Sequence, residues 1–127
     1  MIGLGRWLKQ AGRDEEALQV FRRAVDLGLP DALLFRTIWD IAAMEKRAGR
    51  SAAALGVITD LAASRNAYRA KALEELAKHY ERLEKNYAMA MEMNAAALAL
   101  GETPQLRKRE ERLRKKLEGS KTRKLPL

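Results

Sequence analysis

The chain has 127 residues, enough for one domain with a sizeable core. Its hydrophobic content of 47% and charged content of 33% favour a folded chain over a disordered one. The absence of cysteine excludes disulfides and thiolate chemistry and fits a reducing, cytoplasmic setting. No apolar run approaches the roughly 20 residues of a membrane helix, so we expect no membrane association.

The formal net charge of +8 is unevenly distributed. Residues 102–127 hold ten basic and four acidic residues, and this segment therefore carries +6 of the charge. Such a charge run on a terminal helix is typically a solvated face. The alternative is that the segment neutralises phosphates and makes a salt-sensitive, sequence-independent contact with nucleic acid.

The abundance of helix formers and the placement of glycine and proline predict helix along nearly the whole chain. We expect helices near 2–11, 14–27, 31–48, 51–64, 67–84, 87–100 and 104–118. Gly28 is expected to end the second helix and Ser51 to cap the start of the fourth. Thr103 followed by Pro104 predicts the N-terminus of the last helix.

Small residues recur at a nearly constant spacing. Ala17 and Ala54 are 37 residues apart, and Ala54 and Ala90 are 36 residues apart. Antiparallel helices approach to about 8 Å only where small side chains meet, so these alanines are expected at helix contacts. The matching small residues on the preceding helices are Gly5, Ala42 and Ala77.

In the first unit, "MIGLGRWL" places Leu4, Gly5 and Leu8 in one helix, and "ALQVF" places Ala17 and Phe21 in the next. This pattern resembles the tetratricopeptide repeat, a helix–turn–helix unit of about 34 residues. The resemblance implies an all-α, right-handed α-solenoid of three such repeats with a C-terminal capping helix. The implied repeat domain is 1–119, with units near 1–30, 31–66 and 67–101, a capping helix 103–119 and a flexible basic tail 120–127.

The third unit has a more particular form, in which "ALEELAKHYE" precedes a short polar turn and a helix beginning near Tyr87. Over about residues 65–101 it is similar to the C-terminal repeat region of bacterial proteins that carry a ribonuclease H-like exonuclease domain upstream. The matching residues are Leu73, Glu74, Leu76, Ala77, Lys78, Tyr80, Glu81 and Tyr87. The resemblance implies that any nuclease domain lies outside this chain, and no such activity is carried onto these residues.

Three further features shape the expected architecture. Asn94 stands where the third unit should carry a large apolar residue. Met1 stands where a repeat carries its first large apolar residue, so we expect the chain to be the C-terminal piece of a longer protein. The last helix is expected to cover the final repeat with one apolar side. That side consists of Leu106, Leu113 and Leu117.

Residues suited to catalysis are few. His79 is the only histidine, and Glu75 lies one helical turn before it. Such a pair is most often a surface contact on a helix. No glycine-rich phosphate loop and no cluster of metal-ligating residues occurs. We therefore expect a protein that is not an enzyme, with no catalytic residue, cofactor or metal site.

The tetratricopeptide resemblance implies that the first helix of each unit lines a concave, partner-binding face. This face is rich in cations and carries Trp39 as its one large aromatic residue. It also includes two acidic residues, Glu74 and Glu81. It could bind an acidic peptide with Trp39 as an anchor, or phosphates with Trp39 stacked on a base. The alternative is that these side chains are merely solvated. The expected partner-binding residues are Arg6, Lys9, Arg36, Trp39, Lys46, Arg47, Lys71, Lys78 and Arg82.

The sequence thus predicts a cytoplasmic, bacterial scaffold whose function is to bind a protein or an acidic peptide. The alternative function is that of a nucleic-acid-contacting accessory region in a larger nuclease, which would use the basic face and the C-terminal helix. Self-association through an exposed terminal repeat is a further alternative.

Overall fold

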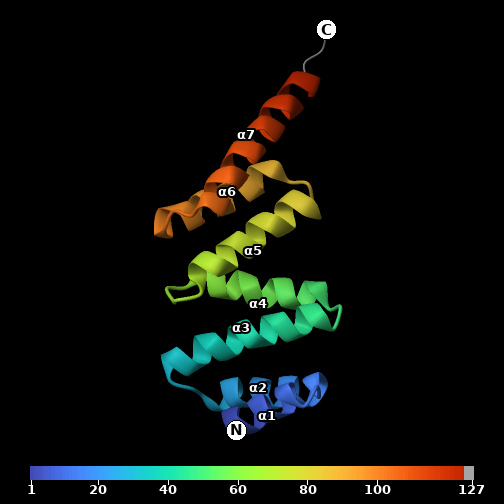
Figure 1. Ribbon diagram of the computed structural model, residues 1–127, viewed down its shortest axis with the longest axis vertical. Coiled ribbons are helices and arrows are strands. Elements are labelled where there is room, and N and C mark those ends of the chain that lie inside the picture. Colours follow the sequence, from blue (N-terminus) through green and yellow to red (C-terminus); the bar gives the residue numbers. More distant parts are fainter. Residues whose placement is uncertain (125–127) are drawn as a thin grey trace. The chain divides into compact units, whose positions relative to one another are not determined.

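The computed structural model describes the backbone of residues 1–124 and the side chains of residues 1–119. Within this part of the chain, the regular structure consists of seven α-helices and no strand (Figure 1). The prediction of an all-α fold is therefore confirmed. The helices belong to two compact units, one over Met1–Tyr68 and one that begins at Arg69.

The first unit contains two helical hairpins. Helix α1 (Ile2–Gln10) packs against α2 (Asp14–Leu27), and α3 (Asp31–Arg47) packs against α4 (Ser51–Ala63). Helix α2 also packs against α3, so the two hairpins share one core. The buried residues of that core are Leu8, Ala17, Leu18, Phe21, Ile41 and Met44.

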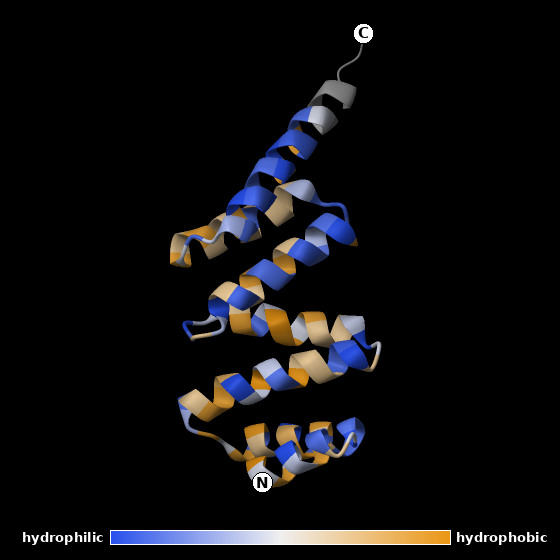
Figure 2. Cartoon of the chain, viewed as in Figure 1, coloured by the Kyte–Doolittle hydropathy of each residue, from blue (hydrophilic) through white to orange (hydrophobic). Residues whose placement is uncertain are grey.

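The second unit contains one hairpin and a long final helix. Helix α5 (Arg69–Arg82) packs against α6 (Tyr87–Leu100), and α6 packs against α7 (Pro104–Lys124). Figure 2 shows mostly hydrophilic residues along the coloured part of α7. Of its predicted apolar side, Leu106 and Leu113 are buried and Leu117 is half-buried. A helix with one narrow apolar side suits the expected covering role.

The alanines predicted at the helix contacts are buried. Ala17 and Ala90 are 0% exposed, and Ala54 is 7% exposed. The closest approach occurs at Gly5, where a Cβ atom would lie 2.4 Å from Cε1 of Phe21. Because Phe21 is itself fully buried, its ring has no room to move aside. The fold therefore requires a residue without a side chain at position 5.

Two of the three predicted helix-end residues are confirmed. Gly28 follows the last residue of α2 with a φ of 95°, and the Thr103 hydroxyl accepts a backbone hydrogen bond at 3.1 Å in the first turn of α7. The prediction for Ser51 is wrong, because Ser51 is already the first residue of α4. The carbonyl of Arg50 accepts the first helical hydrogen bond, from the N–H of Ala54, so Arg50 holds the cap position.

Asn94, the polar residue at an expected apolar position, joins α6 to α7. Its side chain is fully buried, and its Nδ2 donates a hydrogen bond of 2.9 Å to the carbonyl of Leu106. Burying an amide is costly unless it is hydrogen-bonded, and the start of α7 supplies the acceptor for Nδ2, whereas Oδ1 has no hydrogen-bond partner among the described residues. The hydrogen bond from Asn94 therefore ties the first turn of α7 to α6.

The start of α5 differs from the prediction. The helix begins at Arg69 rather than near residue 67, because Asn66 organises a turn before it. The Asn66 Oδ1 accepts a hydrogen bond from the N–H of Tyr68 at 2.8 Å, and its Nδ2 donates to the carbonyl of Leu61 at 2.9 Å. An asparagine that bonds to nearby backbone competes with helix formation.

The end of α7 also differs from the prediction. The helix continues through Gly119 to Lys124, beyond the expected end near residue 118. One glycine inside a helix costs about 1 kcal/mol and does not by itself end the helix. The predicted tail 120–127 therefore begins inside α7, and residues 125–127 lie outside the described part of the chain.

Replacing Gly5 with alanine is expected to destabilise the first unit by about 1–3 kcal/mol, because the new methyl group overpacks the Phe21 ring. Gly3→Ala is the matched control, since no atom lies within 4 Å of a Cβ atom built there. That change should be neutral or slightly stabilising through helix propensity. Urea unfolding followed by circular dichroism measures both, and equal stability of the two variants would refute the contact.

Candidate functional site

The predicted partner-binding residues divide between the two units. Those of the first unit lie on α1 and α3: Arg6, Lys9, Arg36, Trp39, Lys46 and Arg47. Those of the second unit lie on α5: Lys71, Lys78 and Arg82. Each unit contributes exposed cations to this set. They are Arg36, Lys46 and Arg47 in the first unit, and Lys71 and Arg82 in the second.

Two of the predicted cations in the first unit form ion pairs between helices. The Nζ of Lys9 on α1 lies 3.6 Å from a carboxylate oxygen of Asp40 on α3. The Nε of Arg47 on α3 lies 3.4 Å from a carboxylate oxygen of Asp14 on α2. Pairs with such exposure are worth about 0–1 kcal/mol, so a partner carboxylate can replace them at little cost.

Trp39, the predicted aromatic anchor, packs within its own unit. Its ring stacks on that of Tyr68 with centroids 5.7 Å apart and an interplanar angle of 23°. Trp39 is half-buried, so only part of its ring can contact a partner. The contact joins α3 to the segment that follows α4.

His79 and Glu75, the one histidine and the carboxylate a helical turn before it, each pair with another residue. His79 Nε2 lies 3.0 Å from a carboxylate oxygen of Glu84, in the turn after α5. Glu75 lies 3.2 Å from the Nζ of Lys78, another predicted partner-binding residue. Among the residues that the structure describes, no three or more carboxylate, imidazole or thiol side chains are grouped to hold a metal ion.

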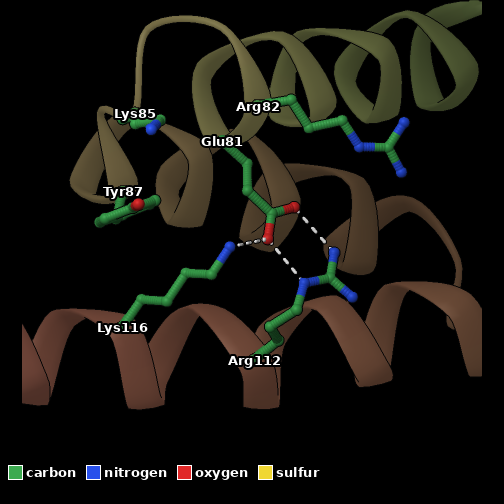
Figure 3. A pocket seen from close by; sticks show the side chains of 6 residues that line it. All are labelled: Glu81, Arg82, Lys85, Tyr87, Arg112 and Lys116. Atoms are coloured by element: carbon green, nitrogen blue, oxygen red, sulfur yellow. Dashed lines mark hydrogen bonds and ion pairs between the residues drawn. The ribbon is translucent and has the colours of Figure 1, made fainter.

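A cationic pocket of about 550 Å³ lies in the second unit, between α7 and the turn that joins α5 to α6. Figure 3 shows Glu81 reaching toward Arg112 and Lys116 on α7, with Lys85 and Tyr87 on one side of it and Arg82 on the other. Four of the six lining side chains are cationic and only one is acidic. We call this site the α5–α7 pocket; it is lined by Glu81, Arg82, Lys85, Tyr87, Arg112 and Lys116.

Glu81 is the structural centre of the α5–α7 pocket. It was expected on the partner-binding face, but it is only 4% exposed because α7 covers it. Arg112 donates to both of its oxygens, at 2.6 and 2.7 Å, and the Nζ of Lys116 donates at 2.9 Å. The Arg112 hydrogen bonds are the main cause that lowers the pKa of Glu81 to about 2, with Lys116 adding to the effect and burial opposing it.

A third α7 cation, Arg109, also lies close to Glu81. Its side chain is 7% exposed, and its Nε and Nη1 lie 3.6 Å from carboxylate oxygens of Glu81 and Glu74 respectively. Neither nitrogen has a hydrogen-bond partner among the described residues. Three cations of α7 thus share one buried carboxylate, and the region keeps a surplus of positive charge.

Tyr87 forms an aromatic wall of the α5–α7 pocket. The Nζ of Lys116 lies 5.1 Å from the centroid of its ring, a cation–π contact. Lys116 is therefore held from two directions, by the Tyr87 ring and by the Glu81 carboxylate. These contacts restrict the side chain before any ligand arrives, which lowers the entropic cost of binding.

Lys85 occupies a backbone conformation that favours glycine. Its φ is 52°, and it directly precedes Asn86, the cap residue of α6. Gly12 and Gly49 precede the cap residues of α2 and α4 in the same way, with φ of 76° and 80°. Left-handed backbone costs a residue with a side chain about 1–2 kcal/mol. The third turn thus places a strained lysine at the pocket where the other turns place glycine.

The first unit also contains a buried carboxylate, Glu45, which is 3% exposed. Arg50 donates to it at 3.0 and 3.1 Å, and Arg22 on α2 lies 3.5 Å away. Hydrogen bonding from Arg50 is the main cause that lowers the pKa of Glu45. Because Arg50 also binds Glu15, this cluster joins α2, α3 and the following turn with balanced charge.

An apolar stripe on α1 and its N-cap residue Met1, which we call the α1 stripe, is exposed. Met1, Leu4 and Trp7 are 55%, 53% and 57% exposed and follow one another at helical spacing. The 37-residue spacing between Gly12 and Gly49 also relates Leu4 to Ile41 and Trp7 to Met44. Those two α3 residues are buried in the same cluster as Leu18 and Phe21 of α2. The face of α3 that corresponds to the exposed α1 residues is therefore covered by α2, the second helix of the first hairpin.

Comparison with models of known protein families gives no match, and a search of curated proteins finds no significant relative. Within the described residues, no helix is both long enough and apolar enough to cross a membrane.

Sequence reasoning did not assign Glu81 to a buried ion cluster, nor Lys85 to a pocket. The partners of Glu81 are separated from it by the whole of α6, and no local pattern marks them. Lys85 did carry a signal, because it is the one non-glycine residue at the turn position of Gly12 and Gly49.

Lys85→Gly is expected to stabilise the chain by about 1 kcal/mol by relieving left-handed strain. Gly49→Ala should do the opposite by a similar amount, since an added Cβ there meets no atom within 4 Å and only the backbone is strained. Urea denaturation midpoints measure both effects. Shifts of the same sign would show that the turn positions are not equivalent.

Glu81→Gln is expected to destabilise the second unit by about 3 kcal/mol at pH 7, because Arg109, Arg112 and Lys116 lose their shared carboxylate. The folded-state pKa of about 2 lies below the usual 4.5. The contribution of Glu81 is therefore present above pH 4.5 and is lost as the pH falls toward 2. Thermal unfolding between pH 2 and 7 should show a smaller loss of stability on acidification in Glu81→Gln than in the wild type and in the exposed-site control Glu92→Gln, because the loss from Glu45 remains in all three.

Proposed function

We propose that the chain is a protein-interaction module built from tetratricopeptide-type helical hairpins. The repeat assignment is supported by three equivalent turns, each with a left-handed residue before the cap of the second helix. It is also supported by the burial of Ala17, Ala54 and Ala90 at matching positions of those second helices. The proposed location of the protein is the cytoplasm, which fits a chain without cysteine.

The observation that carries the proposal is the exposed stripe of Met1, Leu4 and Trp7 on α1. Contiguous exposed apolar side chains on a folded protein mark contact surfaces, and tryptophan is enriched among the residues that dominate binding energy. The equivalent face of α3 is covered by α2 in the first unit's core. We therefore take the occupant of the α1 stripe to be an amphipathic partner helix that packs as α2 packs on α3.

The first-helix cations suit an acidic segment of the same partner. Arg36 and Arg82 are exposed on α3 and α5, and the ion pairs of Lys9 and Arg47 are weak enough to be exchanged. Acidic partners would gain mainly in association rate and selectivity from such a surface. Each unit presents its own set of these cations.

The alternative function, as a nucleic-acid-contacting accessory region, is supported by the excess charge of residues 102–127. Several cations of α7, however, are paired with carboxylates of the same unit. These are Arg107 with Glu102 and Glu110, Arg109 with Glu74 and Glu81, Arg112 and Lys116 with Glu81, and Arg114 with Glu110 and Glu111. These cations are thus already engaged by carboxylates of the protein, which leaves fewer of them free for an extended phosphate backbone and favours the protein-binding function.

The double substitution Leu4→Gln with Trp7→Gln is expected to abolish partner binding without loss of stability, because both side chains are exposed. Leu83→Gln is the matched control, an exposed leucine outside the stripe. Proximity labelling with the wild type and both variants identifies partners that only the stripe variant loses. Hydrogen exchange on the purified complex should then show protection of residues 2–10.

Two results would contradict this prediction. Identical partners for the stripe variant and the control would show that the stripe is not a contact surface. Concentration-dependent dimerisation of the wild type that the stripe variant loses, measured by sedimentation, would show that the occupant is a second copy of the chain.

A further inference from the structure

We infer that the α5–α7 pocket binds a phosphate group borne by a side chain of the protein partner. The inference rests on the proposed function only in taking the phosphate to belong to a protein. It assigns a ligand chemistry to a site in the second unit, separate from the α1 stripe.

The charges of the pocket favour an anion. Arg82, Lys85, Arg112 and Lys116 line it, against the single carboxylate of Glu81. Glu81 also faces the buried Arg109, which Glu74 contacts as well. Two carboxylates thus stand against three cations of α7 and the further pocket cations Arg82 and Lys85. Cations gathered in excess of their counter-charges repel one another, and a bound anion would remove that imbalance.

The donors of the pocket are both available and held in place. Arg112 uses Nε and Nη2 on Glu81, which leaves its Nη1 for a ligand. Lys116 donates one hydrogen bond to Glu81 and retains two further donors. Arg82 and Lys85 make no hydrogen bond or ion pair with the side chains that the structure describes.

The strained backbone at Lys85 is an independent indication of function. The first two hairpins meet the same geometric need with Gly12 and Gly49, and only the third uses a side chain there. That side chain lines the pocket. Strain at a residue that presents a charge to a pocket is typical of a functional position.

The concentration of charge favours a phosphomonoester over other anions. A phosphorylated side chain carries a charge of about −1.5 to −2 at neutral pH and three strong acceptor oxygens. A carboxylate carries one charge, and the diesters of nucleic acid carry one charge each along an extended backbone. Four cations around one open pocket match the phosphomonoester best, and arginine binds it through paired donors.

The test uses the full chain and capped phosphoserine amide, titrated by two-dimensional amide NMR. Binding should shift the amides of Lys85, Tyr87 and Arg112, and capped glutamate amide should bind about tenfold more weakly. The variant Arg82→Gln with Lys85→Asn should weaken phosphoserine binding about tenfold, since each lost cation removes a charge-assisted hydrogen bond. Asparagine tolerates the left-handed backbone, which keeps the turn intact.

The matched control is Lys108→Gln with Lys115→Gln, which removes the same charge from exposed positions of α7. Its affinity for phosphoserine should remain within about twofold of the wild type, because surface charges outside the pocket act only through weak, screened attraction. Equal weakening of the two double variants, or no amide shifts with phosphoserine, would overturn the inference.

A third arm replaces phosphoserine with a single-stranded oligonucleotide that lacks terminal phosphates. If the oligonucleotide binds more tightly than phosphoserine and the pocket variant abolishes its binding, the pocket recognises phosphodiesters and the inference is wrong. Because the α1 stripe is tested with different variants, loss of the pocket inference leaves the proposed protein-binding function standing.

Discussion

In the first hairpin, the backbone of Gly5 lies against the ring of Phe21, so closely that a Cβ atom would stand 2.4 Å from ring carbon Cε1. This contact lets a large buried ring on α2 fill the space that a small residue on α1 leaves. The rest of the first unit depends on it, because Ile41 and Met44 of α3 pack in the same cluster as Phe21. Cores of this kind tolerate little change in volume. The spacing of the small residues is therefore a packing requirement, and the hairpins repeat because the requirement repeats.

Where hydrocarbon does not fill the contacts between helices, buried polar groups do. Glu45 and Glu81 are each nearly inaccessible, and each is surrounded by guanidinium groups from other elements. Asn94 acts in the same way between α6 and α7 through one amide hydrogen bond. Buried ion pairs contribute little net stability compared with hydrocarbon of the same shape, but breaking one is costly. Such groups therefore fix which helix faces meet, and in the second unit they fix the side of α7 that faces Glu81.

The sequence predicted the order of the seven helices, the buried alanines and the glycine contact, because these depend on local spacing. It failed at Ser51, where a suitable cap residue lies one position too late for the turn that the chain makes. It also failed at Glu81, which repeat geometry assigns to an open face. That assignment could not foresee α7, since the partners of Glu81 come from a helix outside the hairpin. Of the predicted binding residues, only Arg82 lines the pocket, and the pocket's other members follow from tertiary packing alone.

Lys85 shows how function can be inferred from a departure within an otherwise regular pattern. Local and global preferences usually agree in natural sequences, and the exceptions concentrate at functional sites. Gly12 and Gly49 adopt a left-handed backbone without strain. Lys85 adopts the same backbone with a side chain, and it adds a positive charge to a pocket that already holds three others. The third turn is also longer, spanning residues 83–86 where the earlier turns span 11–13 and 48–50. The longer turn and the strained lysine occur together at the one hairpin that α7 covers, and both bear on the α5–α7 pocket. Lysine at this turn is not explained by backbone stability, and the charge that it presents to the α5–α7 pocket is the structural feature that sets it apart from Gly12 and Gly49.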